Sequence, residues 1–315
     1  MAKQGLREVE HEITVCAQAA DVYRLIAEIE NWPRIFPPTV YADYAERREQ
    51  QERIRIWATA NGDVKKWTSR RELDPAARRI RFRQEVSAPP VAAMGGTWSV
   101  EPVSERECRV RLLHDYRAVD DDPGQLAFID KAVDTNSRSE LAALKLSVEL
   151  DDGNSAGRLL EFADTVRIGG SPQDVYDFLN EAQRWEERLP HVARIDLQET
   201  TPGLQILEMD TRATDGSTHT TKSIRVCFPH HKIAYKQMTL PALMNLHNGW
   251  WQLENDGDSV LATSHHTVVI NAANIPEILG EGAGLAEARE LVKNSLSANS
   301  RTTLAHAKRY AEARH

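Results

Sequence analysis

The chain is poor in cysteine, in aromatic residues and in long apolar runs, and its charge balance is acidic. Its three cysteines, Cys16, Cys108 and Cys227, show no metal-site or disulfide spacing. A net charge of −8 disfavours nucleic-acid binding, because nucleic-acid-binding domains are usually basic. No stretch approaches the ~18 apolar residues of a membrane span, and the first residues lack a signal-peptide core. We therefore expect a cytoplasmic protein with reduced thiols and without nucleic-acid or membrane partners.

An internal repeat runs through the 315 residues, a length that favours two domains. Asp21-Val-Tyr23 recurs 153 residues later as Asp174-Val-Tyr176. Further pairs follow in the same order at offsets of 152 to 154: Trp32 with Trp185, Asn61-Gly62 with Asp215-Gly216, Arg71 with Arg225, Trp98 with Trp251, and His114 with His266.

The last repeated segment, Asn136–Lys145, returns as Asn299–Lys308 at an offset of 163. The second copy therefore holds about ten extra residues, which we place around residues 275–285. Residues 151–157 have linker composition. We predict an N-terminal domain over residues 1–152 and a C-terminal domain over 158–315.

The hydrophobic pattern predicts the same order of elements in both copies: a strand, a short helix, a run of strands and a long helix. In the first copy the short helix covers residues 20–30 and ends at Trp32-Pro33, because a residue before proline avoids the α region. The predicted strands of this copy are 9–16, 40–48, 52–60, 65–73, 78–87, 95–103 and 107–118, and the long helix is 125–150. In the second copy we predict a strand at 162–168, a helix at 173–182, strands to about 271 and a helix at 286–313. This pattern indicates two α+β domains, in each of which a curved antiparallel sheet wraps a long helix around a cavity.

Two polar segments contain the same Ser-X-Arg pattern, Ser69-Arg-Arg71 and Ser223-Ile-Arg225. Residues two apart on a strand face the same side. We therefore expect a polar patch of one serine and one arginine inside each cavity.

Short fragments in both halves match one known family. They are Asp21–Tyr23, Asn31–Pro33, Trp67–Arg71 and Gly96–Trp98 in the first half, and Trp185–His191, Leu207–Arg212, Asp215–Pro229 and Tyr235–Gln237 in the second. On these residues the chain resembles the didomain aromatase/cyclases of bacterial aromatic polyketide synthesis, which share the START-like helix-grip fold.

The resemblance implies an enzyme of a type II polyketide synthase. Its substrate would be a ketoreduced poly-β-ketone tethered to an acyl carrier protein. The pocket would fold this chain, promote aldol closure of the first ring between C7 and C12, and promote dehydration to an aromatic ring. The partners would be the other synthase components, and no metal or organic cofactor is expected.

Ring closure needs a stabilised enolate or alkoxide, and dehydration needs a proton donor. Arginine is permanently charged and can act as an oxyanion donor, serine can hydrogen-bond the same oxygen, and histidine titrates near neutral pH. The candidate catalytic residues are Arg71, Ser69, Arg225, Ser223, His114 and His266. The candidate substrate-binding residues, as flat or apolar walls, are Trp32, Phe36, Trp67, Trp98, Trp185, Leu189 and Trp251.

Other interpretations remain open. The arginines can pair with carboxylates and the tryptophans can be ordinary core residues. The whole chain can be a non-catalytic carrier of hydrophobic ligands, or a scaffold whose cavities are filled by side chains. The Ser-X-Arg pairs favour the enzyme. The copies also differ, since Trp67 is replaced by Thr221, so we expect two non-equivalent cavities.

Overall fold

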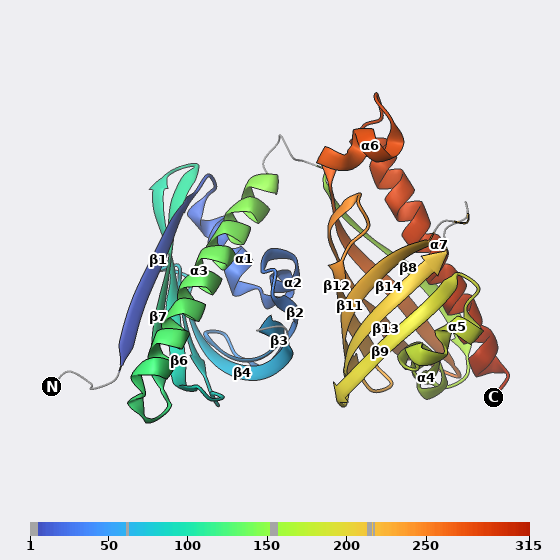
Figure 1. Ribbon diagram of the computed structural model, residues 1–315, viewed down its shortest axis with the longest axis horizontal. Helices are drawn as coiled ribbons and strands as arrows, with labels where there is room; N and C mark the ends of the chain where they lie inside the picture. The colour runs from blue at the N-terminus through green and yellow to red at the C-terminus, as the bar shows by residue number, and fades with distance from the viewer. Residues whose placement is uncertain (1–5, 61–62, 152–156, 213–215, 217) are drawn as a thin grey trace. The chain divides into compact units, whose positions relative to one another are not determined.

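The computed structural model describes residues 6–60, 63–151, 157–212, 216 and 218–315. The expected turn at Asn61-Gly62, residue Asp215, and linker residues 152–156 lie outside the described residues. The chain divides into two compact units, residues 1–155 and 156–315 (Figure 1). Each unit is described by itself.

The N-terminal unit is a seven-stranded antiparallel sheet in the order β1-β7-β6-β5-β4-β3-β2. Its strands are β1 (Arg7–Val15), β2 (Thr39–Arg47), β3 (Gln51–Ala60), β4 (Asp63–Asp74), β5 (Arg79–Gln84), β6 (Val91–Ser104) and β7 (Glu107–Ala118). Its helices are α1 (Ala19–Ala27), the 3-10 turns η1 (Ile29–Asn31) and η2 (Val119–Asp121), α2 (Trp32–Ile35) and α3 (Pro123–Asp151).

The C-terminal unit repeats this topology, with the sheet order β8-β14-β13-β12-β11-β10-β9. Its strands are β8 (Leu159–Gly169), β9 (Val192–Thr201), β10 (Leu204–Arg212), β11 (Thr218–Phe228), β12 (Lys232–Thr239), β13 (Met244–Asp256) and β14 (Ser259–Ile270). Its helices are α4 (Pro172–Asn180), η3 (Ala182–Arg184), α5 (Trp185–Arg188), η4 (Ala272–Asn274), α6 (Ile275–Leu279) and α7 (Leu285–Glu312).

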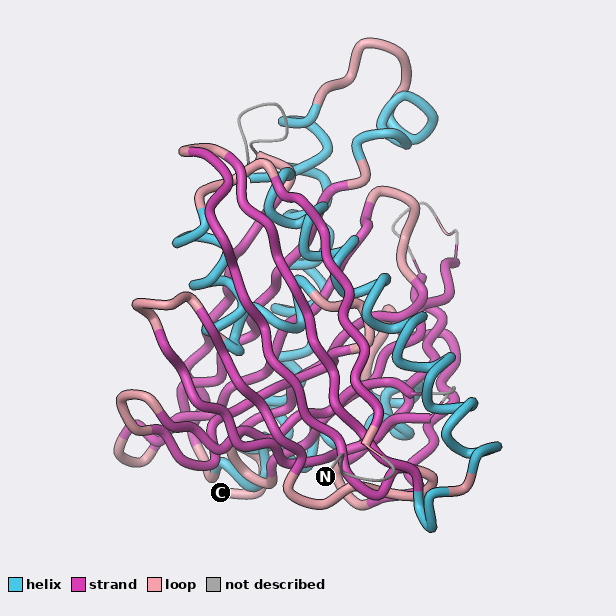
Figure 2. Tube along the Cα trace, turned by 90° about the vertical axis from the view of Figure 1, so that its left-hand side faces the viewer, coloured by secondary structure: helices cyan, strands magenta, loops and turns pink. Residues whose placement is uncertain are grey.

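The core of each unit lies between the sheet and its long helix. Strand residues alternate between the two faces of the sheet, and the apolar ones of β6 and β7, such as Val100 and Leu112, face Leu141 and Leu144 of α3. In Figure 1, α3 runs along one side of the N-terminal sheet, next to β1 and β7. Figure 2 shows the long neighbouring strands that dominate the trace. The predicted α+β class, with two curved antiparallel sheets that each carry a long helix, is confirmed.

The prediction that Trp32-Pro33 ends the first helix is wrong. Helix α1 ends at Ala27, and Trp32 has helical angles, φ −59° and ψ −40°. Pro33 stands in the first turn of α2, where a missing backbone N–H costs nothing. Pro33 therefore helps to begin a second short helix. The steric restriction that a proline places on the residue before it did not indicate this role.

The extra residues of the second copy lie where the offset placed them. Helix α6 and a loop precede α7, and Ile275 of α6 is buried with Ala288 and Val292 of α7. In the N-terminal unit only η2 joins the last strand to the long helix. Among the described residues no helix is both long enough and apolar enough to cross a membrane.

Candidate active site

Arg71 lies on β4 and binds the end of helix α1. It is 2% exposed, and it donates from Nη1 to the Ile26 carbonyl at 3.3 Å and from Nη2 to the Ala27 carbonyl at 2.5 Å. The last carbonyls of a helix have no partner within the helix, so a buried donor there stabilises the helix end. Nε and Nη2 also contact the buried carboxylate of Glu52 on β3, with Nε at 3.1 Å. All three nitrogens of the Arg71 guanidinium therefore contact protein groups.

One residue of the predicted aromatic wall, Trp32, contacts this arginine. The guanidinium lies 5.4 Å from the Trp32 ring, and the Trp32 indole donates to the Ile26 carbonyl at 2.9 Å. Phe36 contacts both Trp32 and Trp98, and its ring centroid lies 5.7 Å from that of Trp32 and 5.9 Å from that of Trp98. Trp67 lies on β4 and packs against a neighbouring cluster that also contacts Trp32. The structure thus brings these four residues and Arg71 into one region; their binding of substrate stays a prediction.

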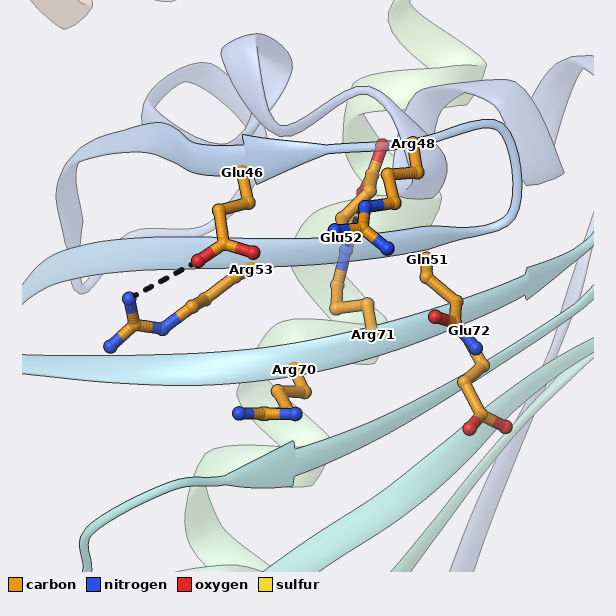
Figure 3. Close-up of a pocket in the computed structure, with 8 residues that line it drawn as sticks. All are labelled: Glu46, Arg48, Gln51, Glu52, Arg53, Arg70, Arg71 and Glu72. Atoms are coloured by element: carbon orange, nitrogen blue, oxygen red, sulfur yellow. Dashed lines mark hydrogen bonds and ion pairs between the residues drawn. The ribbon is translucent and has the colours of Figure 1, made fainter.

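A pocket of about 240 Å³ opens at the ends of β2, β3 and β4 (Figure 3). Its lining is entirely polar: Glu46, Arg48, Gln51, Glu52, Arg53, Arg70, Arg71 and Glu72. Sites for organic ligands are mostly apolar with a few polar groups. This pocket therefore does not match the apolar cavity that the sequence led us to expect for a polyketide chain.

Arg225 on β11 repeats the helix-end contact in the C-terminal unit. It is also 2% exposed and donates to the Leu179 carbonyl of α4 at 2.6 Å. Its guanidinium lies 5.2 Å from the Trp185 ring, and the Trp185 indole donates to the Phe178 carbonyl at 3.1 Å. Trp185, Leu189 and Trp251 are buried in the same core cluster.

The charge on Arg225 is not neutralised as that on Arg71 is. The position equivalent to Glu52 is Gln205, whose side chain donates to Asn180 and to Glu199. Nη1 of Arg225 is buried without a hydrogen-bond partner, and burial lowers the pKa of this arginine from its usual value. The two arginines therefore share a structural contact and differ in their electrostatic surroundings.

His114 on β7 belongs to a different group of side chains. Its Nδ1 lies 3.3 Å from the Ser137 hydroxyl of α3, and the Phe82 ring meets it edge-on at 5.6 Å. Burial lowers the pKa of His114 to about 4, so the imidazole is neutral at pH 7. A neutral imidazole can orient a hydroxyl or relay a proton, but it is a poor acid at pH 7.

Glu140 is a candidate that the sequence analysis missed. It lies three residues after Ser137, on the same face of α3, where neighbouring side chains are about 5–6 Å apart. Its side chain is partly exposed, and desolvation raises its pKa to about 7. Partial exposure together with strong desolvation is expected for a carboxyl group that faces an interior space. A carboxyl group with this pKa is suited to accept and return a proton at neutral pH.

His266 on β14 occupies the place of His114 in the C-terminal unit, in a more polar setting. Its Nε2 lies 2.8 Å from the Ser300 hydroxyl of α7, and its Nδ1 lies 3.0 Å from the Tyr235 hydroxyl and 2.9 Å from Nε2 of His247. Tyr235 and His247 were also missed. Burial lowers the pKa of His247 to about 3 and that of His266 to about 4.

The structure separates the predicted catalytic residues into two groups in each unit. Arg71 contacts the end of α1, whereas His114 contacts the long helix, and no described contact joins them. Ser69 is buried on the same face of β4 as Arg71, while Ser223 is partly exposed on β11. The catalytic roles of all six predicted residues stay predictions.

One signal in the sequence points to Glu140. The repeated helical segments Asn136–Lys145 and Asn299–Lys308 differ at this position, where Thr303 replaces the carboxylate. The same comparison of the copies sets Tyr235 against Phe82 and His247 against Met94, but only strand pairing shows that Tyr235 and His247 come together. Within the described ranges no group of three or more His, Cys, Asp or Glu side chains is placed to hold a metal ion.

Comparison with known proteins adds three findings. Residues 7–149 match the family model described as "Polyketide cyclase / dehydrase and lipid transport". The chain is 52% identical to the granaticin polyketide synthase bifunctional cyclase/dehydratase of Streptomyces virginiae, covering 94% of this chain and 97% of that protein. It is 42% identical to the actinorhodin polyketide synthase bifunctional cyclase/dehydratase of Streptomyces coelicolor, covering 98% of each chain.

Two solved structures match nearly the whole chain. The di-domain ARO/CYC BexL from the BE-7585A biosynthetic pathway is 64% identical, with a TM-score of 0.92 over 97% of this chain and 99% of that one. The di-domain ARO/CYC StfQ from the steffimycin biosynthetic pathway is 34% identical, with a TM-score of 0.89 over the same shares.

Proposed function

The chain belongs to the family of polyketide cyclase/dehydratases, and from this premise we propose that it folds a ketoreduced poly-β-ketone, closes its first ring by aldol addition and promotes dehydration of that ring. The substrate is tethered to an acyl carrier protein, and the closure joins C7 to C12. We propose residues 1–152 and 158–315 as its two aromatase/cyclase domains. The partners are the other components of a type II polyketide synthase.

The feature that carries this proposal is Glu140 on α3, which follows by three residues Ser137, whose hydroxyl lies 3.3 Å from Nδ1 of His114. This unit is also the part that the family model matches. A methylene between two carbonyls is acidic enough for a carboxylate to deprotonate when both are held in place. Fixing one conformer of a flexible polyketide adds a proximity effect that can reach several kcal/mol.

The step is balanced without any added reagent. The Glu140 carboxylate takes the methylene proton, and the electron pair of that C–H bond forms an enolate. The enolate carbon attacks a ketone further along the chain, so that a C–C bond forms and the carbonyl oxygen becomes an alkoxide. Glu140 then returns the proton to the alkoxide, which leaves a ring that carries a hydroxyl group.

In this scheme His114 and Ser137 supply hydrogen bonds, and both side chains are uncharged. At neutral pH the imidazole is uncharged, so its remaining ring nitrogen can orient a carbonyl or hydroxyl of the substrate. Arg71 is given a different task from the one that the sequence predicted. Its contacts to Glu52, Ile26 and Ala27 hold the wall against which the chain would fold.

Reconstitution tests this proposal. The protein is combined with a minimal polyketide synthase and a ketoreductase, and the products are identified by mass spectrometry. Wild type should divert shunt products to compounds with an aromatic first ring. Glu140→Gln should lower the rate of ring closure about 10²–10⁴-fold, the usual contribution of a general acid–base group. Ser139→Ala, on the exposed side of the same helix turn, is the matched control.

The pH profile identifies the group. Because an ionised carboxylate is required, the wild-type rate should rise through about pH 7, where Glu140 titrates. An unchanged shunt profile with wild type would reject the enzyme proposal and favour a carrier of hydrophobic ligands. Full activity of Glu140→Gln across the pH range would reject Glu140 as the base.

A further inference from the structure

The C-terminal unit contains a continuous chain of polar side chains, all of them buried except Tyr235, which is partly exposed. It runs from the Tyr235 hydroxyl on β12 to Nδ1 of His266 on β14, and from Nε2 of His266 to the Ser300 hydroxyl on α7. His247 on β13 contacts both Tyr235 and His266. Its Nε2 lies 3.3 Å from the Tyr235 hydroxyl and 2.9 Å from Nδ1 of His266. The Ser264 hydroxyl lies 3.1 Å from both Nε2 of His266 and the Ser300 hydroxyl. Three strands and the long helix thus contribute to one network.

The N-terminal unit lacks most of this network. By the offset of the repeat, Tyr235 corresponds to Phe82, His247 to Met94 and Ser264 to Leu112. Only the histidine and the serine of the long helix persist there, as His114 and Ser137. Around these positions the two units share the same strand register and differ in three polar groups of the network, and this difference points to chemistry that only the C-terminal unit performs.

The hydrogen atoms of the network can be assigned from burial. Both imidazoles are neutral at pH 7, so each carries one N–H. Nδ1 of His247 is buried without a partner, and an unpaired N–H there would cost more than an unpaired lone pair. Nε2 of His247 therefore carries the proton and donates to Nδ1 of His266, whose Nε2–H donates to Ser300.

This arrangement leaves the Tyr235 hydroxyl beside one imidazole N–H and one imidazole lone pair. The tyrosine side chain crosses Gly249 of β13, where a Cβ atom would lie 2.8 Å from the hydroxyl oxygen. Tyr235 retains partial exposure, whereas His247 and His266 are buried. Burial raises the pKa of Tyr235, so the phenol is protonated at working pH. Tyr235 is therefore the member of the network that can meet a substrate.

We propose that the C-terminal unit is a second catalytic centre, in which Tyr235 dehydrates the ring-closed β-hydroxy ketone that the N-terminal unit produces. The inference rests on the proposed function and adds a division of labour between the units. Tyr235 is the catalytic residue, and His247, His266 and Ser300 position it.

The dehydration is a balanced syn elimination. The Tyr235 hydroxyl gives its proton to the leaving hydroxyl group, the C–O bond breaks and water departs. The phenolate oxygen takes the hydrogen of the neighbouring carbon α to the ketone, and the electron pair of that C–H bond forms the new C=C bond. The Nε2–H of His247 can turn to the transient phenolate and stabilise it, as oxyanion donors do. Tyr235 ends the cycle protonated, and no oxidant or reductant is needed.

Tyr235→Phe tests the proposal, because it removes one oxygen atom and installs the residue of the N-terminal unit. In the reconstituted system this variant should close the first ring at the wild-type rate. It should lower the rate of water loss tenfold or more, so that a ring-closed product heavier by one water molecule accumulates. His247→Met should also slow water loss without slowing ring closure, but to a smaller degree, because it removes only the hydrogen-bond donor to the phenolate.

Tyr310→Phe, which removes a hydroxyl of the same unit that lies outside this network, is the matched control and should leave the ratio of the two steps unchanged. A denaturation curve of each variant reports folding separately from chemistry. If wild type makes an aromatic first ring and Tyr235→Phe shows the same ratio of water loss to ring closure, the second centre is rejected while the proposed function stands. If wild type makes no aromatic ring, the proposed function itself is rejected.

Discussion

The two units of this chain have one topology and two sets of interior chemistry. Both keep an arginine on the fourth strand of the unit that donates to the end of the short helix, and both keep a tryptophan whose indole does the same. These contacts satisfy helix-end carbonyls that any copy of the fold must satisfy. The repeat therefore preserves what holds the fold together.

The groups that carry charge or titrate have diverged. Glu52 pairs with Arg71, whereas Gln205 stands in the equivalent place beside Arg225. The desolvated Glu140 of the first unit corresponds to Thr303 in the second, and Tyr235 of the second unit corresponds to Phe82 in the first. These differences indicate that the interiors of the two units are specialised for different chemistry. Four expected outcomes test this specialisation.

Exchanging the interior carboxyl group should have the largest effect. Glu140→Thr gives the first unit the residue of the second and should reduce ring closure about 10²–10⁴-fold, because the base is lost. The variant should be at least as stable as wild type above pH 7, because a desolvated carboxylate has been removed. Thr303→Val should change ring closure little. Equal losses of rate in both variants, measured by product formation over time, would contradict a specialised first unit.

Removing the charge partner of Arg71 should destabilise the N-terminal unit strongly. Glu52→Gln leaves a buried guanidinium without its carboxylate, a change that typically costs about 3–5 kcal/mol. Urea unfolding followed by hydrogen exchange of peptides from each unit would measure it. Protection should fall in residues 6–151 and persist in residues 157–315. A loss below about 1 kcal/mol would show that the pair is replaceable.

Acid should destabilise the units unequally. The pKa values of His247 and His266 lie below that of a free histidine, so the stability they contribute is present above about pH 6.5 and is lost as pH falls. Between pH 7.5 and 5 this loss is about 2 kcal/mol for a single histidine of this kind, so the C-terminal unit should lose stability over this range.

In the N-terminal unit two groups oppose one another over the same range. His114 loses about 2 kcal/mol, while Glu140, whose pKa is raised to about 7, favours the folded state by about 2 kcal/mol as it becomes protonated. Unit-resolved hydrogen exchange at both pH values should show a drop only in the C-terminal unit. Parallel drops in both units would contradict the assigned protonation states.

Placing a carboxylate beside Arg225 should have the smallest effect. Gln205→Glu brings a negative charge to a buried arginine that lacks one. The same change removes the amide donor that contacts Asn180 and places two carboxylates, Glu199 and the new one, within hydrogen-bonding distance. These terms oppose one another, and we expect a net change within about 1 kcal/mol by denaturation. A gain comparable to the loss in Glu52→Gln would show that the two arginine sites are equivalent after all.

Local rules in the sequence predicted much of this architecture. Alternating apolar residues and turn dipeptides depend on near neighbours, and they identified the order of strands and the two long helices. The spacing of the repeat located the insertion before α7, and the period of two placed Ser69 and Arg71 on one face. The family followed from short motifs that recur in a constant order.

The partners of these residues depended on pairing between distant segments. Nothing near Arg71 in the chain indicates that it would meet Glu52 and the end of α1, and nothing near His114 indicates Ser137. Tyr235, His247 and His266 meet because antiparallel register sets Gly249 opposite both Tyr235 and His266. The raised pKa of Glu140 likewise exists only once the sheet and helix have removed water from around it. The sequence by itself determined the fold and the repeat, because these follow from local periodicity. Tertiary structure alone decided which side chains became chemical neighbours, because register and burial are properties of the packed chain.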